Sequence, residues 1–313
     1  MKVLVTGATG FVGRALVERL ARDSRFSVRA VVRAAVRRES YLPPHVERVA
    51  GELDAAWDWR PALADVAIVV HLAARVHVMR DRAADPLTEY RRVNVAGTEH
   101  LARSAVASGV RRFVFLSSVK VNGEAGTFRE TDTPHPVDPY GVSKLEAEAA
   151  VRAVSAGTSM DVAIIRAPLV YGPNVGANFG SLIRAVQSGI PLPLGAVKNR
   201  RSLVALDNLV DFIMVCMRHP GAAGETFFVS DGEDVSTADL VRRLARAAGH
   251  SARLIPVPPS LLALAASLTG RRDVVQRLMG TLCVDITRAR RQLAWVPPLS
   301  LDEGLRRAIT AAR

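Results

Sequence analysis

The chain has 313 residues, 49% of them hydrophobic, which is enough to bury the core of one large domain or two. It contains no run of about 18 uncharged apolar residues, so we expect no membrane span. The formal charge of +12 comes from scattered Arg without interleaved aromatics, which favours an anionic small molecule over nucleic acid as the partner.

The cysteines and histidines give no sign of a metal site. Cys216 and Cys283 lie far apart in the sequence and match no metal-ligand spacing, and the seven histidines show none either. We therefore assign no metal and expect packing thiols in a reducing cytoplasm. The first predicted strand begins at Lys2, so we expect no signal peptide and a cytoplasmic location.

The chain opens with an apolar strand over residues 2–6, a glycine-rich segment and an amphipathic helix. Gly7, Gly10 and Gly13 follow the spacing Gly-x-x-Gly-x-x-Gly. Glycine lets a pyrophosphate approach the main chain, and the start of a helix offers free N–H groups to phosphate. The order strand, glycine turn and helix is the context of a dinucleotide-binding loop. The alternative is a glycine-rich turn without a ligand.

Predicted strands and helices alternate through the first half, which is typical of a parallel sheet covered on both faces. The strands are expected near residues 28–32, 67–72, 112–116 and 161–166, and the helices near 87–108 and 139–156. Beyond about residue 172, prolines break the pattern into short pieces. A strand and helix over 203–217 and a strand over 226–229 are expected to return to the main sheet.

The predicted fold is therefore α/β, a Rossmann doubly wound parallel sheet with a smaller C-terminal substrate-binding lobe. We assign the dinucleotide-binding domain to residues 1–171 and about 203–230. The substrate lobe would comprise about 172–202 and 231–313.

Lys144, one of only four lysines, follows Tyr140 by four residues. Residues four apart share a helix face, so the ammonium is expected beside the phenol. A neighbouring cation favours the phenolate and lowers the pKa of the phenol, which would let Tyr140 exchange a proton near neutral pH. The alternative is a surface Tyr and Lys on one helix face.

Several segments in register make the chain resemble the extended short-chain dehydrogenase/reductase superfamily, in its NAD-dependent epimerase/dehydratase branch. They are residues 6–13, 51–53, 71–74, 94–98, 116–119 and 166–173. The resemblance implies that Tyr140 is the acid/base, that Lys144 holds the nicotinamide ribose and tunes Tyr140, and that Ser118 bonds the reacting sugar oxygen. It also implies a cofactor site made of Gly7, Thr9, Gly10, Phe11, Val12, Gly13, Glu52, Leu53, Leu72, Ala73, Ala74, Lys144, Pro168 and Val170.

Two departures from the family pattern bear on the subtype. Dehydratases of the family place an acidic pair directly after the catalytic Ser or Thr, where this chain has Val119 and Lys120, so elimination of water is not expected. After the second strand, NAD enzymes usually carry an acidic residue for the ribose 2′-hydroxyl. Here Arg33, Arg37 and Arg38 follow that strand and favour the 2′-phosphate of NADP, with NAD also possible. Alternatively they are surface arginines.

The distal half resembles the family's nucleotide-sugar lobe. Asn178 and Arg201 align with residues that bind the sugar diphosphate, and a guanidinium fork suits phosphate oxygens. This implies a UDP-sugar substrate. The alternatives are a loop cap for Asn178 and a solvated charge for Arg201.

Residues 71–79 and 116–124 resemble a bacterial subgroup, the UDP-4-keto-6-deoxy-N-acetylglucosamine reductases of O-antigen synthesis, with Asn122 and Lys120 as departures. The leading hypothesis is therefore NADPH-dependent reduction of the C4 keto group of a UDP-linked 6-deoxy-N-acetylhexosamine. The runner-up is a UDP-hexose 4-epimerase that holds NAD tightly. A third hypothesis is a non-catalytic dinucleotide sensor, although such proteins tend to lose the Tyr and Lys. The resemblance also implies a homodimer.

Overall fold

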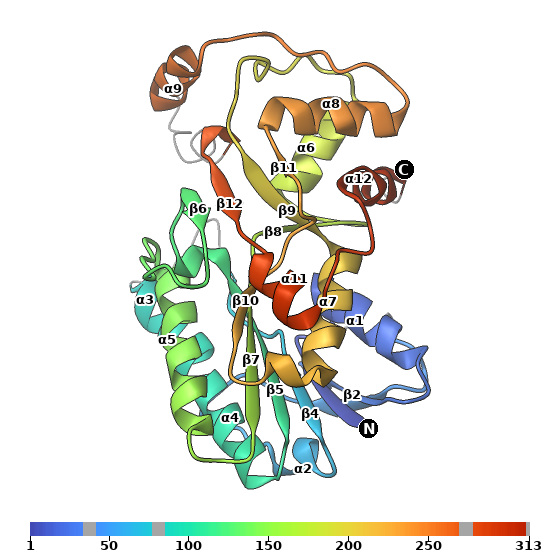
Figure 1. Cartoon of the computed structure of the whole chain (residues 1–313), viewed down its shortest axis with the longest axis vertical. Coiled ribbons are helices and arrows are strands. Elements are labelled where there is room, and N and C mark those ends of the chain that lie inside the picture. The colour runs from blue at the N-terminus through green and yellow to red at the C-terminus, as the bar shows by residue number, and fades with distance from the viewer. Residues whose placement is uncertain (34–41, 77–84, 269–277, 311–313) are drawn as a thin grey trace.

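A computed structural model of the chain describes residues 1–33, 42–76, 85–268 and 278–310. Its main feature is a seven-stranded sheet in the order β10-β7-β5-β4-β1-β2-β3 (Figure 1). All neighbouring strands in it are parallel, so the predicted doubly wound parallel sheet is confirmed. The strands are β1 (Lys2–Thr6), β2 (Ser27–Val32), β3 (Glu47–Ala50), β4 (Ile68–His71), β5 (Arg112–Ser118), β7 (Asp161–Ala167) and β10 (Thr226–Phe228).

The sheet reverses its direction of growth between β1 and β4. From β1 the chain builds outward through β2 and β3, then returns to the other side of β1 as β4 and continues to β5, β7 and β10. In open α/β sheets, ligands bind outside the carboxyl ends of the strands at such a switch point. The glycine-rich segment after β1 and residues 72–76 after β4 both begin at this point.

Helices cover both faces of the sheet. Side chains alternate along β1, so Val3 and Val5 enter one core while Leu4 enters the core on the opposite face. The first core lies under α1 (Phe11–Ala21) and α7 (Leu206–Arg218), and the second lies under α4 (Thr98–Ala107) and α5 (Pro139–Ser155), as Figure 1 shows. Two short helices, α2 (Arg60–Leu63) and α3 (Pro86–Tyr90), lie in the same part of the chain as the main sheet. Helix α3 continues through a π-helical segment, η2 (Arg91–Gly97), into α4.

A second, smaller sheet has the order β11-β9-β12-β6, with β8 paired to β9. Its strands are β6 (Gly126–Phe128), β8 (Leu169–Tyr171), β9 (Arg201–Ala205), β11 (Asp234–Val235) and β12 (Leu282–Val284). The expectation that the strand near residue 203 returns to the main sheet is therefore wrong, whereas β10 and helix α7 do return to it. Pro168 lies between β7 and β8, and because proline lacks an N–H it cannot continue the β7 ladder.

The distal lobe has its own apolar core. Phe179, Ile183, Leu240, Leu244 and Leu305 are among its buried members. They come from α6 (Ala177–Gln187), α8 (Thr237–Ala248) and α12 (Leu301–Thr310). Helix α9 (Pro259–Leu268) extends from the top of this lobe in Figure 1, and α11 (Thr287–Leu293) precedes α12.

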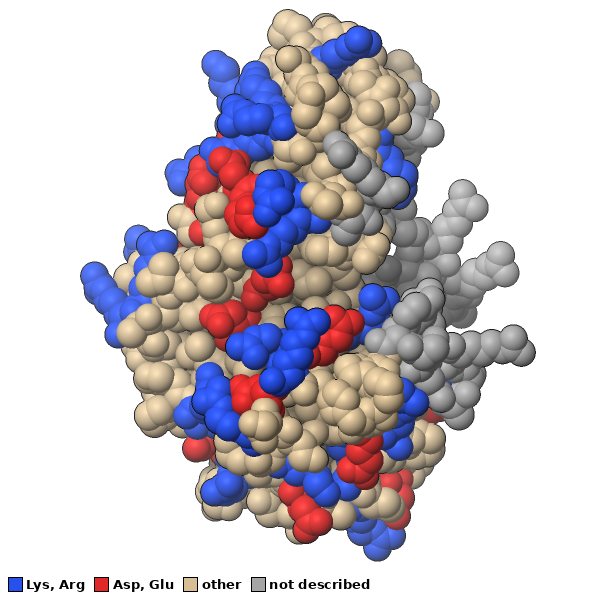
Figure 2. All heavy atoms as spheres, turned by 90° about the vertical axis from the view of Figure 1, so that its right-hand side faces the viewer, with Lys and Arg blue, Asp and Glu red and all other residues tan. Residues whose placement is uncertain are grey.

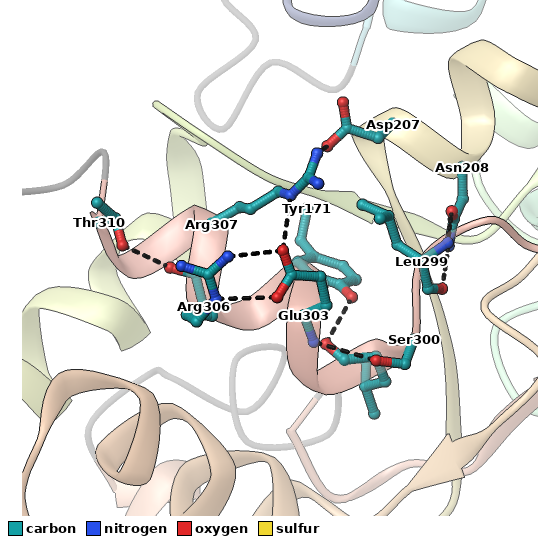
Figure 3. Close-up of polar contacts among 10 residues, drawn as sticks. Tyr171, Asp207, Asn208, Leu299, Ser300, Glu303, Arg306, Arg307 and Thr310 are labelled. Atoms are coloured by element: carbon teal, nitrogen blue, oxygen red, sulfur yellow. Dashed lines mark hydrogen bonds and ion pairs between the residues drawn. The ribbon is translucent and has the colours of Figure 1, made fainter.

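A buried polar cluster joins the distal lobe to the main sheet. Tyr171 donates from Oη to Asp231 at 2.7 Å, and Asn208 on α7 donates to the other oxygen of the same carboxylate at 2.7 Å. Figure 3 shows Asn208 and Leu299 exchanging two hydrogen bonds of 2.9 Å, which fixes the chain just before α12. Burial raises the pKa of Asp231 and of Tyr171, so the phenol remains a hydrogen-bond donor.

The surface carries mixed charge. On the face drawn in Figure 2, Lys and Arg side chains are interspersed with Asp and Glu and form no continuous basic stripe. On helix α4, for example, Arg103 and Glu99 form an exposed ion pair at 2.6 Å. Within the described residues, no helix combines the length and apolar character that crossing a bilayer would need.

Candidate active site

The glycine-rich segment after β1 is packed too closely for side chains. Gly7 has φ +67°, and a Cβ there would lie 2.8 Å from the backbone nitrogen of Ala73. A Cβ at Gly13 would lie 2.1 Å from the carbonyl oxygen of Gly7. Gly10 is the N-cap of α1, and no side chain caps that helix, so its first N–H groups can serve an anion. This backbone cradle, flanked by the half-buried Thr9, Phe11 and Val12, fits a dinucleotide pyrophosphate.

A hydrogen-bonded histidine fixes the neighbouring strand end. His71 is fully buried and contacts Thr6 Oγ1 at 2.7 Å and Thr98 Oγ1 at 2.9 Å. The backbone N–H groups of Leu72 and Ala73 also donate to Thr6 Oγ1, each at 3.2 Å. Burial, with a smaller effect from the Lys144 charge, lowers the pKa of His71 to about 3, so it stays neutral and serves as a structural residue.

The expected adenosine-binding residues lie around the ends of β2 and β3. Glu52 is exposed, and Leu53 is half-buried against Gly97, where a Cβ would lie 2.9 Å from Leu53 Cγ. Arg33 is exposed directly after β2, while Arg37 and Arg38 lie outside the described residues. The structure therefore places one of the three expected 2′-phosphate readers.

The remaining expected cofactor residues frame the nicotinamide side. Ala74 is half-buried beyond β4, Pro168 is buried directly after β7, and Val170 is half-buried in β8. They thus lie at the carboxyl ends of β4 and β7, which flank β5 in the sheet.

The three expected catalytic residues gather at the carboxyl end of β5. Ser118 ends that strand, Tyr140 lies in the first turn of α5, and their hydroxyl groups share a hydrogen bond. Lys144 follows one turn later and is only 2% exposed. Its Nζ donates to Leu116 O at 2.7 Å and lies 4.0 Å from the centroid of the Phe115 ring.

The pKa of Tyr140 corrects one sequence-based expectation. Burial, and then the charge of Asp138, raise this pKa to about 12, although the hydrogen bond with Ser118 lowers it. Burial also lowers the pKa of Lys144 to about 7. The expected lowering of the phenol pKa by Lys144 is therefore wrong in this structure, because burial dominates the pKa of the phenol and the Lys144 ammonium is bonded to Leu116 O.

A buried ion pair beneath the site was not foreseen from the sequence. Glu148 and Arg166 pair at 2.6 Å, with side chains only 4% and 7% exposed. Ser117 donates from Oγ to Glu148, and Arg166 donates to Asn122 Oδ1 at 3.0 Å. Glu148 lies four residues after Lys144 on the same helix, which is the signal that could have revealed it. The pairing with Arg166 depends on the packing of α5 against β7, which brings together segments separate in the sequence.

Asn94 ties the loop after β4 to the catalytic helix. It is buried in η2, accepts from Arg75 N at 2.7 Å and donates to Ser143 Oγ at 3.0 Å. Ser143 in turn donates to Tyr140 O at 2.8 Å. The π-helical turn thereby helps hold the backbone of the catalytic tyrosine.

The two positions after Ser118 carry no carboxylate. Val119 is buried, and the Lys120 ammonium contacts Glu124 at 2.7 Å and also Asp138. The acid and base that the family's dehydratases place here are therefore replaced by an apolar side chain and a paired cation.

The expected diphosphate-binding residues come from the distal lobe. Asn178 is exposed in the first turn of α6. Arg201 is half-buried at the start of β9, where its Nη1 donates to Gly280 O at 3.1 Å. Burial lowers the pKa of this guanidinium. In the described part of the chain, no three His, Cys, Asp or Glu side chains gather as metal ligands.

The fold and the site define a dinucleotide-binding protein of the extended short-chain dehydrogenase/reductase class. The sequence profile of the NAD dependent epimerase/dehydratase family matches residues 3–230, so the chain belongs to that family.

Several known proteins are similar over their whole length. A UDP-glucose 4-epimerase from Vibrio cholerae is 48% identical, with 99% of this chain and 94% of the relative covered. MoeE5, solved with UDP-glucuronic acid and NAD, is 30% identical with a TM-score of 0.78, covering 100% of this chain and 99% of the other. UDP-glucuronic acid 4-epimerase from Bacillus cereus, solved with NAD, shares the fold at 22% identity and a TM-score of 0.80, covering 100% and 98%.

Proposed function

We propose that this chain is a UDP-hexose 4-epimerase that retains NAD. The observation that carries the proposal is the 48% identity to the Vibrio cholerae UDP-glucose 4-epimerase over 99% of the chain. The sequence motifs favour a 4-keto reductase as the leading hypothesis, with the 4-epimerase as the alternative. None of the three similar proteins described above has a reductase name, and two of them are named as 4-epimerases.

The site chemistry supports this proposal. Ser118 and Tyr140 present two hydroxyl groups to one position, where they would hold the sugar 4-oxygen and move its proton. Lys144 would contact the nicotinamide ribose from the same helix. The glycine cradle would bind the NAD pyrophosphate, and bound NAD would supply the oxidation and reduction of C4. The lack of a carboxylate at Val119 and Lys120 argues against a dehydratase.

The distal lobe would select the substrate. We assign residues about 172–202 and 231–313 to nucleotide-sugar binding, with Arg201 and Asn178 on the diphosphate. The half-buried Arg201 is the better placed of the two, because its guanidinium is partly desolvated and so would gain more from an anionic partner than the exposed Asn178 would from its amide.

One observation favours a second candidate, NADPH-dependent reduction of a UDP-linked 4-keto sugar. Arg33 is exposed directly after β2, where it could reach a 2′-phosphate. If Arg33 reads that phosphate, Arg33→Ser weakens NADP binding about tenfold and leaves NAD binding unchanged. Fluorescence titration of both cofactors measures this preference. Equal loss for both would remove the case for NADP.

The test combines product analysis with identification of the retained cofactor. Purified protein is incubated with UDP-glucose or UDP-N-acetylglucosamine, the C4 epimer is quantified by chromatography, and cofactor released by acid is identified. We expect epimer formation, bound NAD, and a loss of about 100- to 10,000-fold in kcat for Tyr140→Phe. Tyr90→Phe is the matched control, because Phe keeps the ring that packs edge-on against Tyr140 at 6.1 Å and removes the hydroxyl that donates to Val76 O.

The contrary outcome is equally specific. Failure to interconvert either UDP-hexose, together with rapid loss of NADPH absorbance when a UDP-4-keto-6-deoxy-N-acetylhexosamine is supplied, would replace the epimerase with the reductase.

A further inference from the structure

Lys120 lies against the first turn of the catalytic helix with its backbone and contacts the cap of that helix with its side chain. It lies in the short helix η3 (Val119–Val121), directly after Ser118, and its backbone N–H donates to Ser118 Oγ at 3.3 Å. Its carbonyl oxygen abuts Gly141, where a Cβ would lie only 2.7 Å away. The Lys120 ammonium contacts the carboxylate of Asp138.

Asp138 is the residue through which this contact reaches Tyr140. It is the N-cap of α5, and its Oδ1 accepts from Gly141 N at 2.6 Å. One carboxylate oxygen thus caps the catalytic helix while the other meets Lys120. Tyr140 lies within this capped turn, two residues after Asp138, so displacement of Asp138 would displace the phenol.

The second carboxylate that contacts the Lys120 ammonium belongs to Glu124, which precedes a strand of the smaller sheet. Glu124 contacts the Lys120 ammonium at 2.7 Å. Burial is the main influence on the pKa of the Arg201 guanidinium and lowers it, and the charge of Glu124 acts on the same group and raises it. Strand β6 follows Glu124 and pairs with β12 at Leu282, and Leu282 pairs with Arg201 on β9. Lys120 therefore lies between the catalytic helix and the proposed diphosphate-binding residue.

We propose that Lys120 is a positioning residue that anchors the Asp138-capped turn of the catalytic helix and neutralises the Asp138 carboxylate near Tyr140. The role in turnover rests on the proposed function, but the effect on the phenol belongs to the chain itself. An exposed ion pair contributes little, whereas this ammonium is about one-quarter exposed and holds two carboxylates of 22% and 37% exposure.

The groups that face Tyr140 determine whether a substitution at Lys120 or Asp138 raises or lowers the pKa of its phenol. They are Ser118 from β5, Tyr90 from α3 and Asp138 from the helix cap. Lys144, one turn later on the same helix, directs its ammonium to Leu116 O. After burial, the Asp138 charge is the largest influence that raises the Tyr140 pKa. Removing Lys120 leaves that charge uncompensated and raises the pKa further, whereas removing the Asp138 charge lowers it.

The experiment compares four variants. Lys120→Met removes the cation, Lys120→Arg retains it, and Asp138→Asn removes the carboxylate while keeping a residue that caps helices well. Lys2→Met makes the same chemical change at a lysine of similar exposure, whose ammonium lies 3.8 Å from the exposed carboxylate of Asp65, at the start of β1. The pH dependence of kcat and KM is measured for each. The ionisation of the Tyr140 phenol is followed separately by NMR of the ligand-free protein labelled at tyrosine. The chain has four tyrosines, so four signals must be assigned.

We expect the pKa that governs kcat to rise by about one pH unit in Lys120→Met and to fall by a similar amount in Asp138→Asn. KM should change less than the rate, Lys120→Arg should restore the profile, and Lys2→Met should match the unaltered chain. The NMR titration should show the Tyr140 phenol ionising at lower pH in Asp138→Asn.

The proposal is overturned if Lys120→Met lowers kcat equally at every pH, or if its profile matches that of Lys2→Met. If the protein turns over no UDP-hexose, the proposed function fails, but NMR of the ligand-free protein still tests the effect of these charges on the Tyr140 phenol. An unchanged Tyr140 titration in Asp138→Asn would then reject the electrostatic role.

Discussion

Lys144 donates from Nζ to the main-chain carbonyl of Leu116 at 2.7 Å, which fastens the catalytic helix to β5 two residues before Ser118. The same contact keeps the ammonium nearly free of solvent, so burial lowers its pKa to about 7. The residue that the family uses on the cofactor ribose is thus a structural link in this chain as well.

The buried lysine should make stability depend on pH in a defined window. Between the folded pKa of about 7 and the ordinary value of 10.5, the folded chain holds a neutral amine while the unfolded chain binds the proton. The free energy of unfolding therefore gains up to about 1.4 kcal/mol per pH unit from this group as pH rises through the window. Lys144→Met should remove that gain. Urea unfolding at several pH values measures it, and an unchanged slope in the variant would contradict it.

Breaking the Glu148–Arg166 pair should be costly. Arg166→Met leaves the Glu148 carboxylate buried without its cation, and the free energy of unfolding should fall by about 3–5 kcal/mol. Arg103→Met breaks the exposed pair with Glu99 and should cost less than about 1 kcal/mol. Chemical denaturation of both variants provides the comparison. Similar losses would show that the buried pair is already solvated in the folded chain.

The glycine cradle should reject a single methyl group. Gly13→Ala places a Cβ 2.1 Å from Gly7 O, which only a backbone shift can relieve, so we expect a loss of about 3 kcal/mol in stability and loss of dinucleotide binding. Gly176→Ala is the matched control, since a Cβ there meets nothing within 4 Å. Thermal unfolding and cofactor titration are the measurements. Retained NAD binding in Gly13→Ala would mean that the loop does not contact the pyrophosphate.

Two leucines of the distal lobe should differ sharply in their contribution to stability. Leu244 is fully buried on α8, so Leu244→Ala should cost about 2–5 kcal/mol, including the cavity it creates. Leu264 on α9 is 58% exposed, and Leu264→Ala should change stability by less than about 0.5 kcal/mol. Denaturant midpoints measure both. A large loss at Leu264 would show that α9 is covered in solution.

Much of the fold could be read from local pattern. The alternation of apolar strands with helices predicted the parallel sheet, because strands buried on both faces need apolar residues at every position. The same reasoning misplaced the strand at residues 201–205. Its apolar residues resemble those of a main-sheet strand, and strand partners are chosen by contacts between distant segments.

The sequence by itself determined the class of chemistry, because Gly7, Gly10, Gly13, Tyr140 and Lys144 act through local spacing on one turn or one helix face. Only the tertiary structure decided how those groups are tuned. The Lys144–Leu116 bond, the Glu148–Arg166 pair and the Lys120–Asp138 contact join segments 18 to 28 residues apart. Burial and charge at such contacts depend on how β5, β7 and α5 pack, and sequence spacing does not encode that.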